Sequence, residues 1–242
     1  MSEMIRALVT GGSGGIGAAI CRRLAADGRF VYVHAHRNSA GAAAVVGEIE
    51  SAGGRAESVA CDLTDLAATR ACMDRLLEAG PIQILINNAG THEDAVFPGM
   101  SPEQWRRVLD VSVNGFYNVT QPLMLPMIRT RWGRIVNITS VTALAGNRGQ
   151  VNYAAAKGAL NAATKSLSFE VASRGITVNA VAPGIIASGM GESAFDADTI
   201  AGLVPMKRAG SAAEVASLVA FLTSSEAAYI SGQVISINGG MY

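Results

Sequence analysis

Thr10-Gly-Gly-Ser-Gly-Gly-Ile-Gly17 connects a short apolar run, residues 4–10, to a segment with apolar residues at helical spacing. We expect a strand before this stretch and a helix after it. Glycines at such a junction let the backbone turn tightly and approach a pyrophosphate at the helix N-terminus. The stretch therefore predicts a dinucleotide site in an α/β fold. The alternative is a glycine-rich turn without a ligand, since the spacing is wider than G-x-G-x-x-G.

The remaining sequence alternates short apolar runs with helical segments, which is typical of βαβ units. The expected strands are 4–10, 30–34, 57–61, 82–86, 134–140, 176–181 and 234–237. We predict an α/β, Rossmann-type, doubly wound parallel sheet of about seven strands with helices on both faces. No linker or repeat divides the chain, so one domain spans 1–242. Small and polar residues predict a substrate lid at about 187–205.

Composition excludes several classes of function. The 242 residues are 50% hydrophobic, which suits one large domain with a buried core. The 19 basic and 19 acidic residues cancel, so nucleic acid and anionic membranes are not expected partners. We expect neither a membrane span nor a signal peptide. The three cysteines lack metal-ligand spacing, so we expect buried thiols in a reducing cytoplasm and no metal.

The end of the second strand indicates which dinucleotide binds. It reads His34-Ala-His-Arg-Asn38, with no acid for the ribose hydroxyls of NAD, but with Arg37 for the extra phosphate of NADP. We therefore expect NADPH, unless Arg37 is only a solvated loop residue. Asp62 follows the third strand, where it suits the adenine edge, the cap of a helix at 66–78, or both.

Polar residues also end the fourth and fifth strands. Asn87-Asn-Ala-Gly90 and Ser140 stand where parallel sheets bind ligands. A capping box at 101–104 begins a helix whose apolar residues we expect to be core: Trp105, Val108, Leu109, Val113, Phe116 and Tyr117. Asn114 interrupts this pattern, and a buried Asn holds a water or distorts the helix. Pro122 and Pro126 should kink or end the helix.

Tyr153-Ala-Ala-Ala-Lys157 carries the predicted chemistry. The two outer residues lie one helical turn apart on one face. A nearby ammonium favours the phenolate and lowers the pKa of a tyrosine, which can then exchange a proton with a substrate oxygen. The spacing alone is common by chance, and an ordinary surface pair is the alternative.

Taken together, these motifs resemble the short-chain dehydrogenase/reductase family over essentially the whole chain. The matching positions are Thr10 to Gly17, Asp62, Asn87 to Gly90, Asn114, Ser140, Tyr153 to Lys157, and Pro183-Gly184. The resemblance implies that Ser140 and Tyr153 bind the ketone oxygen and that Tyr153 donates the proton. It implies that Lys157 binds the nicotinamide ribose and lowers the pKa of Tyr153, while Asn114 holds a water. The implied cofactor contacts are Gly11, Ser13, Gly15, Ile16, Gly17, Arg37, Asp62, Leu63, Asn88, Ala89, Gly90, Tyr153, Lys157, Pro183, Gly184, Ile186 and Ser188.

Within that family the chain is most similar to the bacterial β-ketoacyl-(acyl carrier protein) reductases. This similarity implies reduction of a 3-oxoacyl thioester in a fatty acid, polyene or polyketide line, and a homotetramer. It also implies that Arg131 and Arg174 dock the carrier at the mouth of the site, whereas dipole-stabilised helix ends are the alternative. Thr91-His-Glu-Asp94 departs from the subfamily pattern. A dehydrogenase of a small alcohol, sugar or steroid, or a redox-sensing binding protein, therefore stays open.

Overall fold

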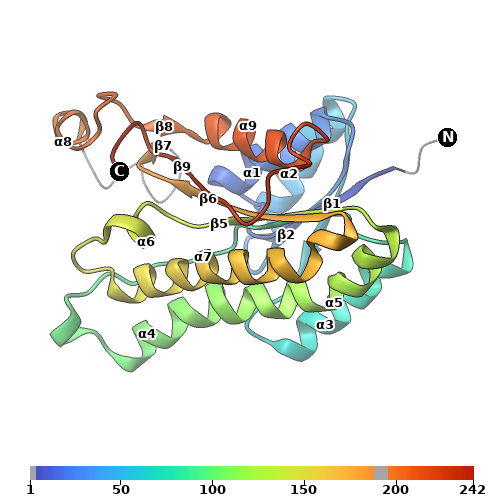
Figure 1. Cartoon of the computed structure of the whole chain (residues 1–242), viewed down its shortest axis with the longest axis horizontal. Coiled ribbons are helices and arrows are strands. Elements are labelled where there is room, and N and C mark those ends of the chain that lie inside the picture. The colour runs from blue at the N-terminus through green and yellow to red at the C-terminus, as the bar shows by residue number, and fades with distance from the viewer. Residues whose placement is uncertain (1–3, 188–195) are drawn as a thin grey trace.

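The computed structural model describes residues 4–187 and 196–242. A seven-stranded parallel sheet in the order β3-β2-β1-β4-β5-β6-β9 forms its centre (Figure 1). Its strands are β1 (Arg6–Val9), β2 (Phe30–Ala35), β3 (Arg55–Ala60), β4 (Ile84–Asn87), β5 (Gly133–Ile138), β6 (Ile176–Pro183) and β9 (Val234–Ile237). β7 (Ile186–Ala187) and β8 (Gly210–Ser211) form a separate pair. The predicted fold class is confirmed.

Helices cover both faces of this sheet (Figure 1). One face carries α1 (Gly15–Ala26), α2 (Ser39–Ser51) and α9 (Ala212–Thr223); the other carries α3 (Leu66–Glu78), α4 (Pro102–Leu109), α5 (Gly115–Thr130) and α7 (Val151–Val171). A π-helical turn, Asp110–Asn114, joins α4 to α5, and the short helices α6 (Thr142–Ala145) and α8 (Ala197–Leu203) lie at the carboxyl edge of the sheet. Within the described residues, no helix is long and apolar enough to cross a membrane.

The inner strands β1, β2, β4, β5 and β6 are buried on both faces, which explains their nearly continuous apolar runs, whereas the edge strands β3 and β9 are partly exposed. Along β1, Ala7 and Val9 pack into the core beneath α1 and α9, while Leu8 packs into the core beneath α3 and α5. The same alternation in β4 sends Ile84 and Leu85 to opposite cores. This two-sided packing fixes the sheet register and so the positions of the loops at its carboxyl edge.

Several local predictions are wrong. The two prolines do not end α5, which continues through Pro122 and Pro126, because Val119, Leu123 and Met127 are fully buried around them and hold the helix in place; a kink there stays a prediction. Tyr117 is 58% exposed rather than core. Asp65 caps α3 by accepting a 2.9 Å hydrogen bond from Ala68 N–H, so Asp62 is not the cap.

The prediction for the cysteines is met only in part, and the lid stays a prediction. Cys21 and Cys72 are buried, but Cys61 is half-buried. Of the expected lid, residues 188–195 lie outside the described residues. The following part contains α8, whose cap Asp196 accepts a 2.7 Å hydrogen bond from Thr199 N–H.

Candidate active site

The carboxyl ends of the strands bring most of the predicted site residues to one edge of the sheet. The glycine loop follows β1, Asp62 follows β3, Asn88 to Gly90 follow β4 and Ser140 follows β5. Because the strand order reverses between β1 and β4, this edge opens at a topological switch point. A ligand crevice is expected there in an open α/β sheet.

The glycine loop is built for close backbone approach. A Cβ on Gly17 would lie 2.1 Å from Gly11 O, so helix α1 can meet the loop only with glycine at that position. Gly11 adopts a positive φ of 63°. The N-cap Gly14 supplies no side-chain hydrogen bond, and the first turn of α1 carries no acid. The first N–H groups of this 12-residue helix are therefore left for an anion, which fits a pyrophosphate.

Thr10 and Asn88 lock the glycine loop to the loop after β4. Thr10 Oγ1 accepts hydrogen bonds from the N–H groups of Asn88 and Ala89, each at 3.0 Å. Asn88 Nδ2 donates to the carbonyls of Thr10 and Gly11, also at 3.0 Å. The Asn88 side chain is thus a structural clamp between two segments of the predicted cofactor site.

Ser140, Tyr153 and Lys157 converge where β5 meets α7. Ser140 is 9% exposed, and its Oγ accepts a 3.1 Å hydrogen bond from Thr142 N–H. Lys157 is 3% exposed; its Nζ donates to Ile138 O at 2.9 Å and lies 5.8 Å from the centroid of the Tyr153 ring. A buried ammonium therefore stands beside a phenol and a hydroxyl at the carboxyl edge of the sheet.

The pKa values of this group differ from our expectation. Burial lowers the pKa of Lys157 to about 8. Burial also raises the pKa of Tyr153, and the Asp94 carboxylate adds to that increase, while a hydrogen bond with Ser140 opposes it. Tyr153 is therefore held as a neutral phenol, with Lys157 bonded to a carbonyl instead of the phenol oxygen. A neutral phenol can donate a proton, which suits reduction of a carbonyl.

Asn114 does not join this group. It is exposed, and its Nδ2 donates to Asp110 Oδ1 at 2.7 Å. Our expectation of a buried Asn is wrong, although the helix is distorted into a π-helical turn as predicted. The extra residue in that turn rotates the positions that follow it, so the helical pattern does not reveal which side chain faces inward.

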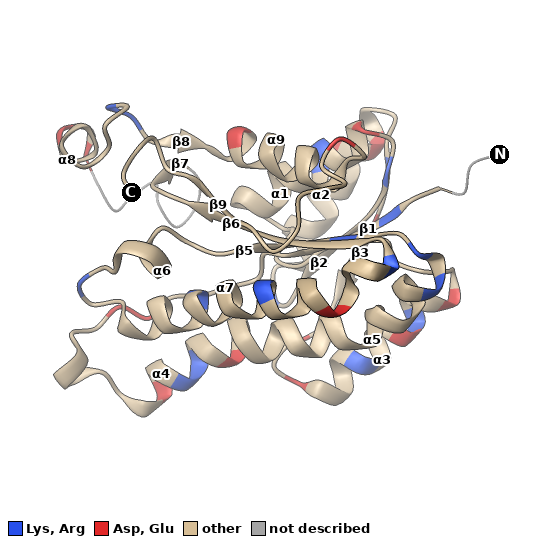
Figure 2. Cartoon of the chain, in the orientation of Figure 1, with Lys and Arg blue, Asp and Glu red and all other residues tan. Residues whose placement is uncertain are grey.

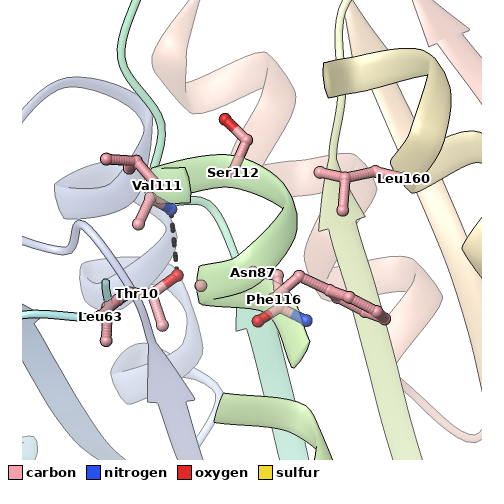
Figure 3. A pocket seen from close by; sticks show the side chains of 9 residues that line it. Thr10, Leu63, Asn87, Val111, Ser112, Phe116 and Leu160 are labelled. Atoms are coloured by element: carbon pink, nitrogen blue, oxygen red, sulfur yellow. Dashed lines mark hydrogen bonds between the residues drawn. The ribbon is translucent and has the colours of Figure 1, made fainter. Parts of the chain in front are cut away.

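Ser112, two residues earlier, faces inward and was missed by the sequence analysis. It is 2% exposed, and its Oγ is buried without a hydrogen-bond partner among the described residues. A Cβ on Gly90 would lie 3.0 Å from Lys157 Nζ and 3.8 Å from Ser112 Oγ, so both groups border the same glycine. Figure 3 shows the Ser112 hydroxyl pointing away from Thr10 and Asn87, beside a cavity of about 10 Å³.

A buried polar chain holds α7 against the sheet beneath the site. Asn87 Nδ2 donates to Asn137 Oδ1 at 2.9 Å, Asn137 Nδ2 donates to Thr164 Oγ1 at 2.8 Å, and Thr164 Oγ1 donates to Leu160 O at 2.8 Å. Fully paired networks of this kind fix relative positions in a core. This one links β4 and β5 to the helix that carries Tyr153.

The far end of the expected dinucleotide site is polar and exposed. Asp62 Oδ1 accepts hydrogen bonds from Thr64 N–H and Oγ1, and these bonds hold the pKa of its carboxyl below the usual range. Arg37 is exposed and forms no ion pair with the residues that the structure describes. Its guanidinium is available to a phosphate. At the other end, Pro183 and Ile186 are buried, Gly184 is half-buried, and Ser188 lies outside the described residues.

His92 and Asp94 lie beside Tyr153. The His92 and Tyr153 rings are edge to face, with centroids 6.5 Å apart. His92 Nδ1 lies 3.0 Å from Asp94 Oδ1, and Gln150 Nε2 donates to both Asp94 oxygens at 3.1 Å. Polar groups therefore stand beside Tyr153 at the point where the sequence departs from the subfamily pattern.

Arg131 and Arg174 lie together, but not at the mouth of the site. Arg131 Nη2 donates to Ser173 O at 3.4 Å. Both residues precede strands, at the ends of α5 and α7 opposite Tyr153 (Figure 1). Since α7 has 21 residues, it spans about 30 Å. Figure 2 shows Lys and Arg interspersed with Asp and Glu over helices and loops. Our expectation that both arginines lie at the mouth of the site is therefore wrong for the site on the same chain.

Comparison with known proteins identifies the family of this chain. The short chain dehydrogenase family profile matches residues 6–199. The chain belongs to this family. Its members are oxidoreductases that act on CH–OH groups with NAD(P)H, and this chain is one of them. Among the residues described, no group of three or more His, Cys, Asp or Glu could hold a metal ion.

Relatives that match this short chain dehydrogenase over its whole length include 3-oxoacyl-(acyl-carrier-protein) reductases and nodulation proteins. The 3-oxoacyl-(acyl-carrier-protein) reductase of Aggregatibacter actinomycetemcomitans is 43% identical over 243 residues, covering 100% of both chains. The protein of the same name from Escherichia coli is 42% identical over 240 residues, covering 98% of this chain and 96% of its own. Nodulation protein G of Azospirillum brasilense is 40% identical over 244 residues, covering 100% of this chain and 99% of its own.

Proposed function

We propose that this protein reduces a 3-oxoacyl thioester, linked to an acyl carrier protein, to the 3-hydroxyacyl product in fatty acid or related polyene or polyketide synthesis. The observation that carries the proposal is the convergence of Ser140, Tyr153 and Lys157 beside the glycine loop. The proposal is supported by the match of this chain, along its whole length, to 3-oxoacyl-(acyl-carrier-protein) reductases.

NADPH is the cofactor that the residues favour. The N-terminus of α1 and Gly11 suit the pyrophosphate, and exposed Arg37 suits the additional phosphate, for which no acid competes in His34-Ala-His-Arg-Asn38. Arg37→Asp should shift the ratio of kcat/KM for NADPH to that for NADH towards NADH by about tenfold or more, because a carboxylate replaces a counter-charge. An unchanged ratio would show that Arg37 does not face the phosphate.

The side chains around the crevice then have separate roles. Ser140 Oγ and Tyr153 Oη hold the ketone oxygen and so orient the carbonyl. The bound cofactor supplies the hydride. Tyr153 donates its phenolic proton to the same oxygen, as its raised pKa allows. Lys157 is placed to bind the ribose and, as a cation, to stabilise the phenolate left behind.

We further propose that Ser112 and Lys157 share a water that returns the proton to Tyr153. The Lys157 ammonium has three donors and makes one hydrogen bond to the described residues, while the Ser112 hydroxyl makes none. Gly90 leaves space between them that a side chain would fill. Buried polar groups in this condition usually bind ordered water.

We also propose a homotetramer as the working form. The edge strand β9 leaves Val234, Ile235 and Ile237 partly exposed, and Leu125 and Phe169 are 63% and 86% exposed on α5 and α7. Exposed apolar surfaces of this kind are typical of subunit contacts. Light scattering after gel filtration tests the state directly: a mass near four chains is expected, and a mass of one chain contradicts it.

A steady-state comparison tests the activity. Acetoacetyl thioester with NADPH should give turnover far above that of a panel of polyols and steroids with NAD. The second candidate, a dehydrogenase of a small polar alcohol, is favoured by His92 and Asp94 beside Tyr153. Preference for a polyol with NAD would establish that candidate instead. Absence of turnover with every carbonyl and alcohol would favour a binding protein.

A further inference from the structure

His34 is a buried histidine that connects two loops of the cofactor edge. It lies near the end of β2 and is 2% exposed. Its Nδ1 is 3.3 Å from Gly11 N in the glycine loop, and its Nε2 is 3.1 Å from Cys61 O, directly before Asp62. Its ring therefore joins the turn expected to bind the pyrophosphate to the segment expected to border the adenine.

Only one protonation state satisfies both contacts. Gly11 N–H is a donor, so Nδ1 must carry a lone pair; Cys61 O is an acceptor, so Nε2 must carry the hydrogen. Protonation of the ring would put a hydrogen on Nδ1 as well, facing the Gly11 N–H. The bond to the glycine loop would then be replaced by a contact between two donors.

Gly11 has little freedom to move away from such a contact. Its carbonyl accepts from Asn88 Nδ2 at 3.0 Å and faces Gly17, where α1 passes without room for a Cβ. The next residue, Gly12, donates its N–H to the carbonyl of His34 at 2.7 Å. The loop is thus fixed from the β2 side by the backbone and ring of one residue.

We propose that neutral His34 is a positioning residue for the cofactor loop, and that its protonation weakens NADPH binding. The proposal rests on the proposed cofactor site. Burial, the largest influence, lowers the pKa of His34 below its ordinary value of 6.5. The charged groups that act on the ring are His36, after the same strand, and Asp62, after β3; residues 10–15 carry no ionisable side chain. The loop bond is present above the lowered pKa and is lost as the pH falls through it.

Three variants separate this role from simple packing. His34→Gln keeps an acceptor and a donor separated by one carbon, as in imidazole, but does not titrate in this range. His34→Leu removes both hydrogen bonds. His36→Gln is the control, because it removes the neighbouring histidine, which pairs with Asp62 at 3.6 Å, and leaves His34 in place.

The measurement is the dissociation constant of NADPH by fluorescence titration between about pH 5 and pH 8. As the pH falls, the dissociation constants of wild type and His36→Gln should rise relative to that of His34→Gln. The ratio to the His34→Gln value at each pH is compared, because titration of NADPH itself cancels from it. His34→Leu should bind about tenfold more weakly even at the upper pH, with kcat at saturating NADPH nearly unchanged.

Two results would overturn the proposal: the same pH dependence in His34→Gln as in wild type, or wild-type affinity in His34→Leu. If His34→Leu fails to fold, the comparison with His34→Gln still decides. Wild-type protein that binds neither NADPH nor NADH at any pH would instead refute the proposed cofactor site itself, and the inference with it.

Discussion

Ser112 and Asn114, two polar residues of the π-helical turn, have different surroundings. Their substitution should therefore change kcat to different extents. Ser112 Oγ is buried near Lys157, whereas Asn114 is exposed and bonded to Asp110. Ser112→Ala should lower kcat by about tenfold or more, with little change in the KM for NADPH, because a group that holds the relay water is lost. Asn114→Ala should keep kcat within about twofold, as expected for an exposed substitution.

Steady-state kinetics on both variants test this assignment. The reverse order, with Asn114→Ala the more damaging, would show that the turn rearranges during turnover and would return the role to Asn114. Equal, small effects would mean that the proton reaches Tyr153 without the proposed water.

At this scale the sequence predicted which side chains come together better than it predicted their surroundings. Ser140, Tyr153 and Lys157 could be identified because their spacing and strand ends are visible in the sequence. The inward direction of Ser112 could not, because it depends on one inserted residue in a helical turn. The raised pKa of Tyr153 could not either, because it results from burial that only the packed structure shows.

At the scale of the element, the glycine loop offers a matched pair of substitutions. Gly17→Ala should strongly weaken NADPH binding and lower the melting temperature, because its Cβ would lie 2.1 Å from Gly11 O and 2.7 Å from Asn88 Nδ2. A Cβ at Gly14 would have no atom within 4 Å, and any residue can adopt the φ of −176° found there, so Gly14→Ala should be tolerated. It should bind NADPH within about threefold of wild type.

Calorimetric melting with NADPH titration distinguishes the two variants. Normal binding by Gly17→Ala would contradict the close approach of α1 to the loop. An equal loss in Gly14→Ala would mean that the loop tolerates no side chain at all, so its geometry would not explain which glycines are needed.

The elements themselves were largely predictable, since apolar runs and capping boxes mark them. The capping box at Ser101 begins α4 as expected. Only Asp62 was considered as the cap of α3 and Asp65 was missed, because both acids precede the helix and the exact first residue of a helix is hard to read from a sequence. The persistence of α5 through two prolines likewise reflects burial of its neighbours, which local propensity does not include.

At the scale of the whole molecule, the fold separates the site from the candidate docking residues. Tyr153 lies near the start of α7, while Arg131 and Arg174 lie at the opposite edge of the sheet. Topology alone implies this separation, because helices run antiparallel to the strands in such a fold; the resemblance had suggested otherwise. A carrier docked on these arginines must therefore deliver its substrate to another subunit of the proposed tetramer.

A mixing experiment tests this arrangement. Arg131→Glu with Arg174→Glu should slow reduction of the carrier-linked substrate by about tenfold or more and leave a short free thioester unaffected. Mixed oligomers of this double variant with Tyr153→Phe subunits should regain carrier-linked turnover, since one subunit docks and the other reacts.

The controls are the two unmixed variants under identical salt. Equal losses on both substrates would indicate a stability effect, and no loss on either would remove these arginines from carrier docking. A selective loss that mixing does not restore would contradict delivery between subunits.

The central claim, that Tyr153 is the proton donor in an NADPH-dependent reduction, is tested most directly by one comparison. The rate of NADPH oxidation with acetoacetyl thioester is measured for wild type and Tyr153→Phe, after equal NADPH binding by both has been established. We predict that Tyr153→Phe loses at least about 100-fold in kcat, because only the donor hydroxyl is removed. Retention of more than about a tenth of kcat, with cofactor binding intact, would contradict the account.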